Sequence, residues 1–197
     1  LLEKILALTP VRAMMTELYA HDADTARHAV RVAVYAIALG LHYDFEGKNL
    51  ETVGLGALLH DTGKCDIELE ILNGKNNLTM AERARITHHP RHSFLRLTDT
   101  LFEQARRVAV AHHEFQRQPY PRRGIERRSN VQRTNERRRY RPFIRIAAEL
   151  VAVADMYDAL TSARTYKTAW PKERVFSVMK EEFKGHPDII NVLMTLQ

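Results

Sequence analysis

The chain has 197 residues, a formal net charge of +6 and 45% apolar residues, enough for one domain with a full core but cramped for two. Its single cysteine, Cys65, cannot form an intramolecular disulfide, which favours a cytoplasmic setting. No apolar run reaches the roughly 18–20 residues that a membrane span needs, so we expect no membrane partner. Because the first residue is Leu1 rather than methionine, we expect an excerpt of a longer chain.

Helical periodicity dominates, so we predict an all-α fold: a single domain over residues 1–197, with seven or eight helices and a core at about 24–184. Capping signals mark several helix starts, among them Thr9-Pro10 and the Thr79–Glu82 capping box. Residues 67–73 also fit an extended conformation. The helices are expected at residues 9–20, 26–41, 47–60, 79–88, 101–114, 142–163 and 171–184, with a last one from Pro187.

Positive charge is concentrated in one segment of the chain. Residues 115–145 hold eleven arginines against two acids, a net charge of +9, so the rest of the chain carries −3. Prolines and asparagines without an apolar period predict a long arginine-rich loop at about 115–141. The loop fits either a solvated insertion or an anion-attracting flap beside a phosphate site. Nucleic acid is a disfavoured partner, because interleaved aromatic residues and a groove-entering helix are missing from the pattern.

Polar side chains recur on helix faces that should be apolar. A single histidine on such a face is more often a hydrogen-bonded core residue than a ligand. Several such polar side chains are explained together if they converge on bound metal, because imidazole and carboxylate are the usual ligands of iron, manganese, zinc or cobalt. The inward-facing set on five or six helices or their ends is His28, His60, Asp61, His89, His112, His113 and Asp155.

Seven candidate ligands exceed the number that one ion uses, so we expect two divalent ions bridged by the carboxylate of Asp61. Such a pair suits phosphoester hydrolysis, because it binds phosphoryl oxygens and lowers the pKa of a bridging water. Lys64, three residues after Asp61, fits either a positive charge near the phosphate or a surface lysine at a helix end. Asp61 and Lys64 are the candidate catalytic residues.

These motifs resemble those of the HD superfamily of metal-dependent phosphohydrolases. His28, the His60-Asp61 pair and Asp155 match its H…HD…D signature. Further stretches are similar to the HD-GYP subfamily, whose best-known members hydrolyse cyclic di-GMP. They are Ile86-Thr-His88-His89-Pro90, Ala111-His112-His113-Glu114 and the run from Asp155 to Lys167.

The resemblance implies a division of the ligands and a set of substrate contacts. Iron or manganese is expected, with zinc, cobalt or nickel as alternatives. One ion would be held by His28, His60, Asp61 and Asp155, and the second by His89, His112 and His113, with Asp61 shared. The implied substrate-binding residues are Lys64, Tyr120, Arg164, Tyr166 and Lys167.

Two departures from the subfamily pattern stand out. After His112-His113-Glu114 this chain keeps Tyr120-Pro121, but the usual glycines are lost and the spacing is one residue shorter. Because proline supplies no N–H and forbids the conformations that glycine permits, this degenerate motif leaves cyclic di-GMP specificity open. Asp24, one helical turn before His28, fits either a ligand of a third ion or a helix cap.

Three functions follow as hypotheses. The leading one is a phosphodiesterase of bacterial signalling that opens a cyclic dinucleotide, above all cyclic di-GMP, by attack of a metal-bridging hydroxide on phosphorus. The second is a phosphohydrolase of another nucleotide. The third is a catalytically silent HD-type binding module, which typically loses the ligands that are present here. The resemblance also implies an upstream sensory or receiver domain, and we keep a homodimer as a further expectation.

Overall fold

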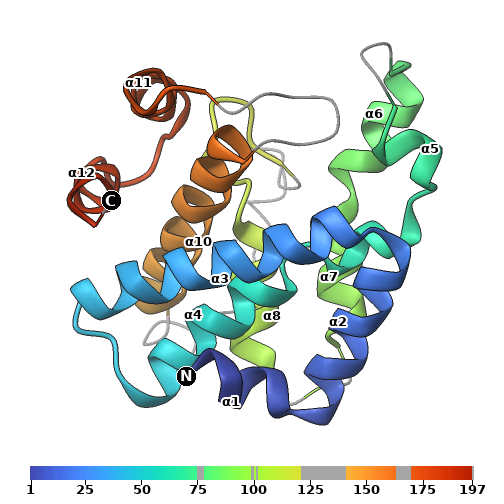
Figure 1. The fold of residues 1–197 in the computed structure, drawn as a ribbon, viewed down its shortest axis with the longest axis horizontal. Helices are drawn as coiled ribbons and strands as arrows, with labels where there is room; N and C mark the ends of the chain where they lie inside the picture. The colour runs from blue at the N-terminus through green and yellow to red at the C-terminus, as the bar shows by residue number, and fades with distance from the viewer. Residues whose placement is uncertain (75–77, 99, 101, 121–140, 163–169, 197) are drawn as a thin grey trace, which may run out of the picture.

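The computed structural model describes residues 1–74, 78–98, 100, 102–120, 141–162 and 170–196. Figure 1 shows that the described chain is built of helices, which confirms the all-α prediction. The helices are α1 (Leu2–Ala7), α2 (Thr9–His21), α3 (Ala23–His42), α4 (Gly47–Leu59), the 3-10 helix η1 (Thr62–Asp66), α5 (Leu69–Leu72), α6 (Met80–Thr87), α7 (His89–Arg96), α8 (Glu103–Ala111), α10 (Arg141–Thr161), α11 (Lys172–Glu182) and α12 (Asp188–Thr195).

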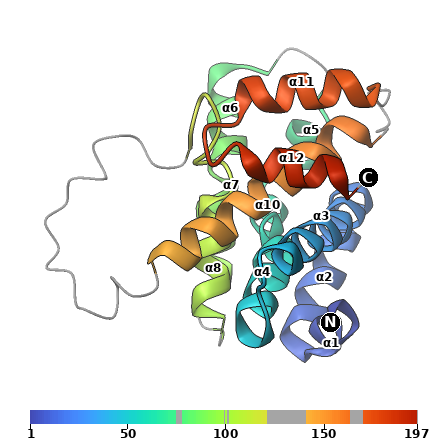
Figure 2. The same ribbon diagram turned by 90° about the vertical axis from the view of Figure 1, so that its left-hand side faces the viewer.

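Helix α4 lies at the centre of the core, against α3, α8 and α10 (Figures 1 and 2). Every residue from Thr52 to Leu59 is buried, so α4 presents no face to solvent along this stretch. Gly56 permits the close approach of α8, since a Cβ atom there would lie 2.7 Å from Val108 Cγ1. This core fixes the carboxyl end of α4, where His60 and Asp61 follow.

The helix starts partly follow the capping signals of the sequence. Thr79 and Glu82 form the predicted capping box of α6. The cap of α3, however, is Asp22, whose carboxylate accepts hydrogen bonds from the backbone N–H groups of Asp24 and Thr25. The capping role considered for Asp24 is therefore wrong. Its carboxylate lies 2.8 Å from Nη1 of Arg27 on the helix surface.

Two further details differ from the expected elements. Within residues 67–73, Leu69–Leu72 form the short helix α5 rather than an extended segment. The helix α7 follows α6 after a turn at His88 and was not predicted. Most of the predicted arginine-rich loop, residues 121–140, lies outside the described residues. Among the described helices, none combines the length and the apolar character required to cross a bilayer.

Candidate metal centre

The seven candidate ligands come together from five places in the fold. His28 lies in α3 and Asp155 in α10, and both side chains face the same interior region. The others sit at helix ends: His60 and Asp61 follow α4, His89 begins α7, and His112 and His113 follow α8. All are buried except His113, which is partly buried. The structure thus gathers the complete predicted set.

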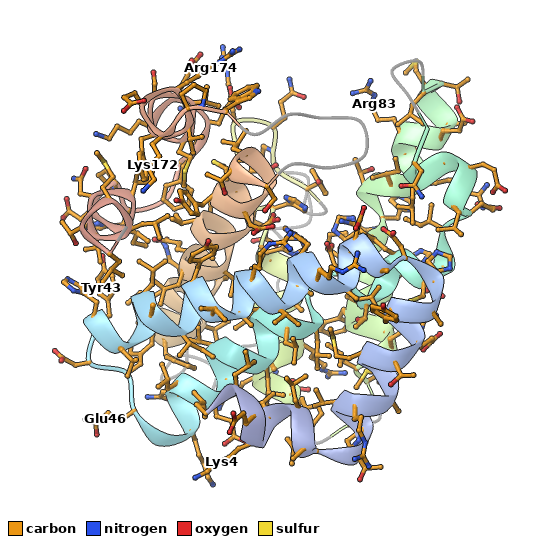
Figure 3. The ribbon with its side chains drawn as sticks, in the orientation of Figure 1. Lys4, Tyr43, Glu46, Arg83, Lys172 and Arg174 are labelled. Atoms are coloured by element: carbon orange, nitrogen blue, oxygen red, sulfur yellow. The ribbon has the colours of Figure 1, made fainter. Side chains whose placement is uncertain are left out.

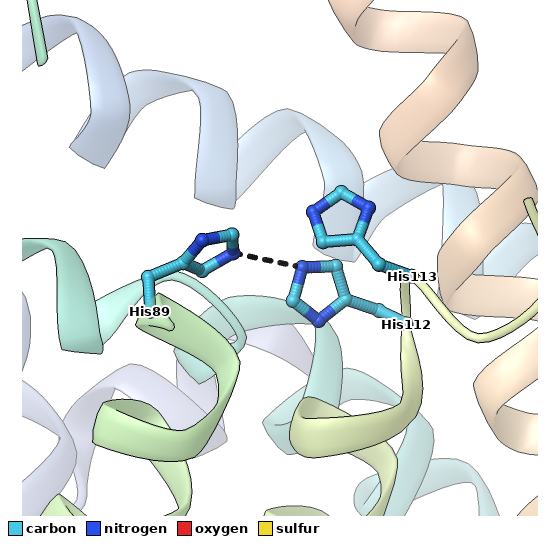
Figure 4. Close-up of side chains that lie close together, drawn as sticks. All are labelled: His89, His112 and His113. Atoms are coloured by element: carbon cyan, nitrogen blue, oxygen red, sulfur yellow. Dashed lines mark hydrogen bonds between the residues drawn. The ribbon is translucent and has the colours of Figure 1, made fainter. Parts of the chain in front are cut away.

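Their donor atoms form three overlapping groups in which every pair of candidate ligand atoms lies within 4.8 Å. Figure 4 shows the rings of one group, with Nε2 of His89 and Nε2 of His112 separated by 3.2 Å. Because His60 and His112 each belong to two groups, the three form one continuous centre. The groups are His28, His60 and Asp155; His60, Asp61 and His112; and His89, His112 and His113.

Asp61 lies where the two halves of this centre meet. One half holds His28, His60 and Asp155, and the other holds His89, His112 and His113. Its Oδ2 atom is 3.2 Å from Nε2 of His60, and its Oδ1 atom is 3.1 Å from Nε2 of His89. At the other end, Asp155 Oδ1 lies 3.0 Å from Nε2 of His28. One carboxylate therefore faces both sets of histidines, as a bridging ligand must.

Three of the histidines are oriented by the same local device. Nδ1–H of His60, His89 and His112 each donates to the backbone carbonyl three residues earlier, at 2.6, 2.7 and 2.5 Å. These carbonyls lie at or near helix ends, where intrahelical N–H partners run out. With the proton held on Nδ1, the lone pair of Nε2 faces the centre, which is the tautomer that a metal ligand needs.

Burial and neighbouring charges set the protonation of the cluster. Burial holds the pKa of His89 and His112 below the usual range and lowers the pKa of His113 to about 3, so these rings are neutral near pH 7. Burial would raise the pKa of Asp61, but His60 and Lys64 outweigh it and hold this pKa well below normal. At His89, His112 and His113 the result is neutral imidazoles beside the ionised carboxylate of Asp61, the protonation states that metal binding requires.

The residues present fit a bound cation. Nε2 of His60 and Oδ1 of Asp61 are buried and have no hydrogen-bond partner within the described part of the chain. A buried polar atom left in this state costs about 1–3 kcal/mol, which a bound ion would offset. Imidazole nitrogens with carboxylate oxygens suit iron, manganese, zinc or cobalt. The thiol of Cys65 stays protonated, since burial raises its pKa to about 11.

The turn after His60 brings η1 against α7. The N–H of Gly63 donates to Oγ of Ser93 at 2.8 Å, and Ser93 Oγ donates to the carbonyl of His60 at 2.6 Å. A Cβ atom on residue 63 would lie 2.2 Å from the carbonyl oxygen of His89, so only glycine fits. This close contact places Asp61 and His89 side by side.

The other predicted site residues lie at different distances from the ligand cluster. Nζ of Lys64 lies 2.6 Å from Asp61 Oδ2, which places its charge at the centre rather than on the open surface. The Tyr120 ring stacks on His113 with centroids 4.4 Å apart. Asp24 pairs with Arg27 on the surface and belongs to none of the three groups, so a third ion stays a prediction. The predicted contacts Arg164, Tyr166 and Lys167 lie outside the described residues.

Sequence reasoning missed three residues that hold the ligands in place. Asp158 and Arg31 support His28, and the side-chain amide of Gln116 lies 2.7 Å from Nδ1 of His113. Asp158 follows Asp155 by three residues on α10, and this spacing was the available signal that both carboxylates share one face.

Comparison with known proteins agrees with this geometry. The HD domain family matches residues 25–160, and the chain belongs to that family of metal-dependent phosphohydrolases. Over 177 residues it is 30% identical to the cyclic di-GMP phosphodiesterase PA4108 of Pseudomonas aeruginosa, an alignment that covers 88% of this chain and 39% of the relative. This likeness confirms the predicted relationship to the HD-GYP phosphodiesterases.

Two further relatives are more distant. A cyclic di-GMP phosphodiesterase of Thermotoga maritima is 27% identical, with 89% of this chain and 45% of the relative covered. The 3'3'-cGAMP-specific phosphodiesterase 2 of Vibrio cholerae is 26% identical, with 89% and 32% covered. The chain thus spans less than half the length of these curated relatives.

Proposed function

We propose that this domain is a metal-dependent phosphodiesterase that hydrolyses a cyclic dinucleotide, with cyclic di-GMP as the leading substrate. The observation that carries the proposal is the position of Asp61, whose two oxygens face His60 and His89 from the two halves of one buried ligand cluster. Similarity to relatives named as cyclic di-GMP phosphodiesterases supports the choice of substrate.

The ligands divide into two sets in this proposal. His28, His60 and Asp155 would hold one divalent ion, and His89, His112 and His113 a second, with Asp61 shared. When bound, such a pair supplies a Lewis acid for phosphoryl oxygens and lowers the pKa of water. Iron or manganese is the proposed metal, and zinc, cobalt and nickel suit the same donors.

The side chains of this chain have separate tasks in the proposed reaction. The ammonium group of Lys64, next to Asp61, would stabilise negative charge that develops on the phosphate. The Tyr120 ring, stacked on His113, would cover that side of the centre and limit the access of water. Arg164, Tyr166 and Lys167 are proposed substrate contacts by resemblance.

Cationic side chains also stand on both sides of the upper end of the molecule. Figure 3 shows Arg83 projecting from α6 on one side and Lys172 and Arg174 from α11 on the other. We propose that these exposed cations assist the approach of an anionic substrate, although α11 carries as many acidic as basic residues. We also propose a cytosolic setting, a longer parent protein with an upstream sensory or receiver domain, and a homodimer.

The proposal is tested by incubating purified protein, loaded with Mn²⁺ or Fe²⁺, with cyclic di-GMP and separating the products by chromatography. We expect linearised dinucleotide from the unaltered protein and none from Asp61→Ala. Asp66→Ala is the matched control, because Asp66 pairs with Arg96 and His92 outside the cluster and should keep full activity. Hydrolysis that survives Asp61→Ala contradicts the proposed mechanism.

A second candidate substrate is another nucleotide, above all 3'3'-cGAMP. Two relatives of 26% and 28% identity are named as specific for this compound, and the shortened motif before Tyr120 departs from the subfamily pattern. A panel of cyclic di-GMP, 3'3'-cGAMP and mononucleotides separates the candidates by their rates. If the purified protein holds no stoichiometric metal and hydrolyses none of these nucleotides, a catalytically silent module is favoured instead.

A further inference from the structure

The carboxylate of Asp158 is buried behind the metal centre, on the far side of His28. It is 1% exposed and accepts a hydrogen bond from Nδ1 of His28 at 2.7 Å. Arg31 donates to both of its oxygens, from Nε at 2.6 Å and from Nη2 at 3.0 Å. The hydroxyl of Ser162 donates to Oδ1 at 3.0 Å. Asp158 is therefore saturated with donors and points away from the proposed ions.

His28 is held differently from the neighbouring ligands. Nδ1 of His60, His89 and His112 meets a neutral backbone carbonyl, whereas Nδ1 of His28 meets a charged carboxylate. The reason lies in position, because His28 sits within α3, where the backbone carbonyls are already used by the helix. A side chain from another element must supply the acceptor, and α10 supplies Asp158.

The protonation of this trio follows from its partners. The carboxylate of Asp158 accepts from Nδ1 of His28 on one side and from the guanidinium of Arg31 on the other. Because a carboxylate paired with a guanidinium only accepts hydrogen bonds, Nδ1 of His28 must carry a proton. Nε2 faces Oδ1 of Asp155, 3.0 Å away, and is the ring nitrogen left for an ion.

We propose that Arg31 and Asp158 form a positioning pair that fixes the tautomer and orientation of His28 for metal binding. Asp158 contacts the imidazole ring of His28, and the pair acts on the proposed ion through that ring. A carboxylate behind a ligating histidine also makes the ring a stronger donor. This inference rests on the proposed metal site, and it assigns to Arg31 and Asp158 a role in the affinity of the ion next to His28.

The variant that tests the pair is Asp158→Asn. An NH₂ group in place of Oδ2 would face the donors of His28 and Arg31, and in place of Oδ1 it would face those of Arg31 and Ser162. Either orientation sets donors against each other and removes the charge behind His28. Loss of such an outer carboxylate typically costs roughly 10- to 100-fold in metal affinity. We expect a loss of this size for the ion next to His28, and less than about a twofold change for the ion next to His89, His112 and His113, since the ligand that Asp158 bonds is His28.

Glu149 provides the matched control on the same helix. It is 2% exposed, its Oε1 accepts from Nε of Arg145 at 2.8 Å, and its Oε2 accepts from the backbone N–H of His186 at 3.1 Å. Glu149→Gln therefore makes the same chemical change at a buried, arginine-paired carboxylate that contacts no metal ligand. We expect it to lower stability without changing either metal affinity.

The measurement is calorimetric titration of metal-depleted protein with Mn²⁺, together with the visible spectrum after loading with Co²⁺. If Asp158→Asn does not fold, Arg31→Gln replaces it, because the Arg31 side chain is 40% exposed and tolerates substitution more readily. The positioning role is supported if the Asp158 or Arg31 variant binds Mn²⁺ more weakly at one of two sites and has an altered Co²⁺ spectrum. Glu149→Gln should show the affinities and the spectrum of the unaltered protein.

Two results overturn the inference and are distinguishable. If the unaltered protein binds Mn²⁺ and the Asp158 or Arg31 variant binds it with the same affinities and the same Co²⁺ spectrum, the pair has no positioning role while the proposed function stands. If the unaltered protein binds no Mn²⁺ at all, both the inference and the proposed metal centre are wrong.

Discussion

Oδ1 of Asp61 lies 3.1 Å from Nε2 of His89, although 28 residues separate them in the chain. This contact depends on the turn at Gly63, which packs η1 against the start of α7, and it joins the two halves of the ligand cluster. The proposed two-ion centre therefore depends on packing between helix ends as much as on the ligands themselves.

Metal should stabilise the fold. Ligand that binds only the native state adds about 2.7 kcal/mol to the free energy of unfolding at a hundred times its dissociation constant. We expect thermal unfolding to shift upward when Mn²⁺ is added to chelator-treated protein. Ca²⁺, which prefers oxygen ligands, should have little effect and is the control ion. Identical melting temperatures with and without Mn²⁺ would count against an ion in this cluster.

Gly63→Ala should damage both stability and metal binding. The added methyl group would meet the His89 carbonyl oxygen and the Ser93 backbone nitrogen, at 2.2 and 2.4 Å, so the backbone itself must move. Overpacking of this kind costs about 1–3 kcal/mol, measurable by urea unfolding. In the control Gly54→Ala the new atom meets only the side-chain ends of Ile5 and Ile37, so Mn²⁺ affinity should be kept. Equal Mn²⁺ affinity in Gly63→Ala would show that the turn does not place Asp61.

Ser93→Ala removes a hydroxyl that links α7 to the segment between α4 and η1. The buried N–H of Gly63 would lose its acceptor, and the carbonyl of His60 would lose a donor. We expect the free energy of unfolding to fall by about 1–3 kcal/mol. Thr98→Ala, which removes an exposed hydroxyl bonded to a helix carbonyl, should change it far less. Similar losses in both variants would contradict the role given to Ser93.

Tyr120 should act through its ring rather than its hydroxyl. Burial holds the pKa of the phenol well above its usual value, so the group stays protonated at neutral pH and cannot serve as a base. Tyr120→Phe keeps the ring that stacks on His113 and should leave kcat and KM for cyclic di-GMP nearly unchanged. Tyr120→Ala removes the ring and should raise KM several-fold. A large loss of kcat in Tyr120→Phe would assign the chemistry to the hydroxyl instead.

The sequence predicted those parts of the site that carry a local signal. His60 and Asp61 follow the apolar helix α4, and His112 and His113 follow the amphipathic helix α8. His28 and Asp155 interrupt apolar stripes, so the burial of these ligands could be inferred. Helix α7 was missed because its eight residues, HPRHSFLR, are mostly polar and show little apolar periodicity. Its position is set by tertiary contacts with η1 and α8.

The residues that hold the ligands in place could not be predicted from the sequence. Asp158 meets His28 and Arg31 across 130 and 127 residues, and no spacing rule connects positions so far apart. The cap of α3 was misplaced by two residues for a different reason. Asp22 and Asp24 are chemically equivalent as caps, and the position of the helix start decides which carboxylate reaches the exposed N–H groups.

The most direct test of the central claim is anomalous diffraction from crystals grown with Mn²⁺ and measured at the manganese absorption edge. We predict two peaks on either side of the Asp61 carboxylate, one next to His28, His60 and Asp155 and the other next to His89, His112 and His113. Crystals that show no anomalous peak within this cluster, although the protein hydrolyses cyclic di-GMP, would contradict a two-ion centre bridged by Asp61.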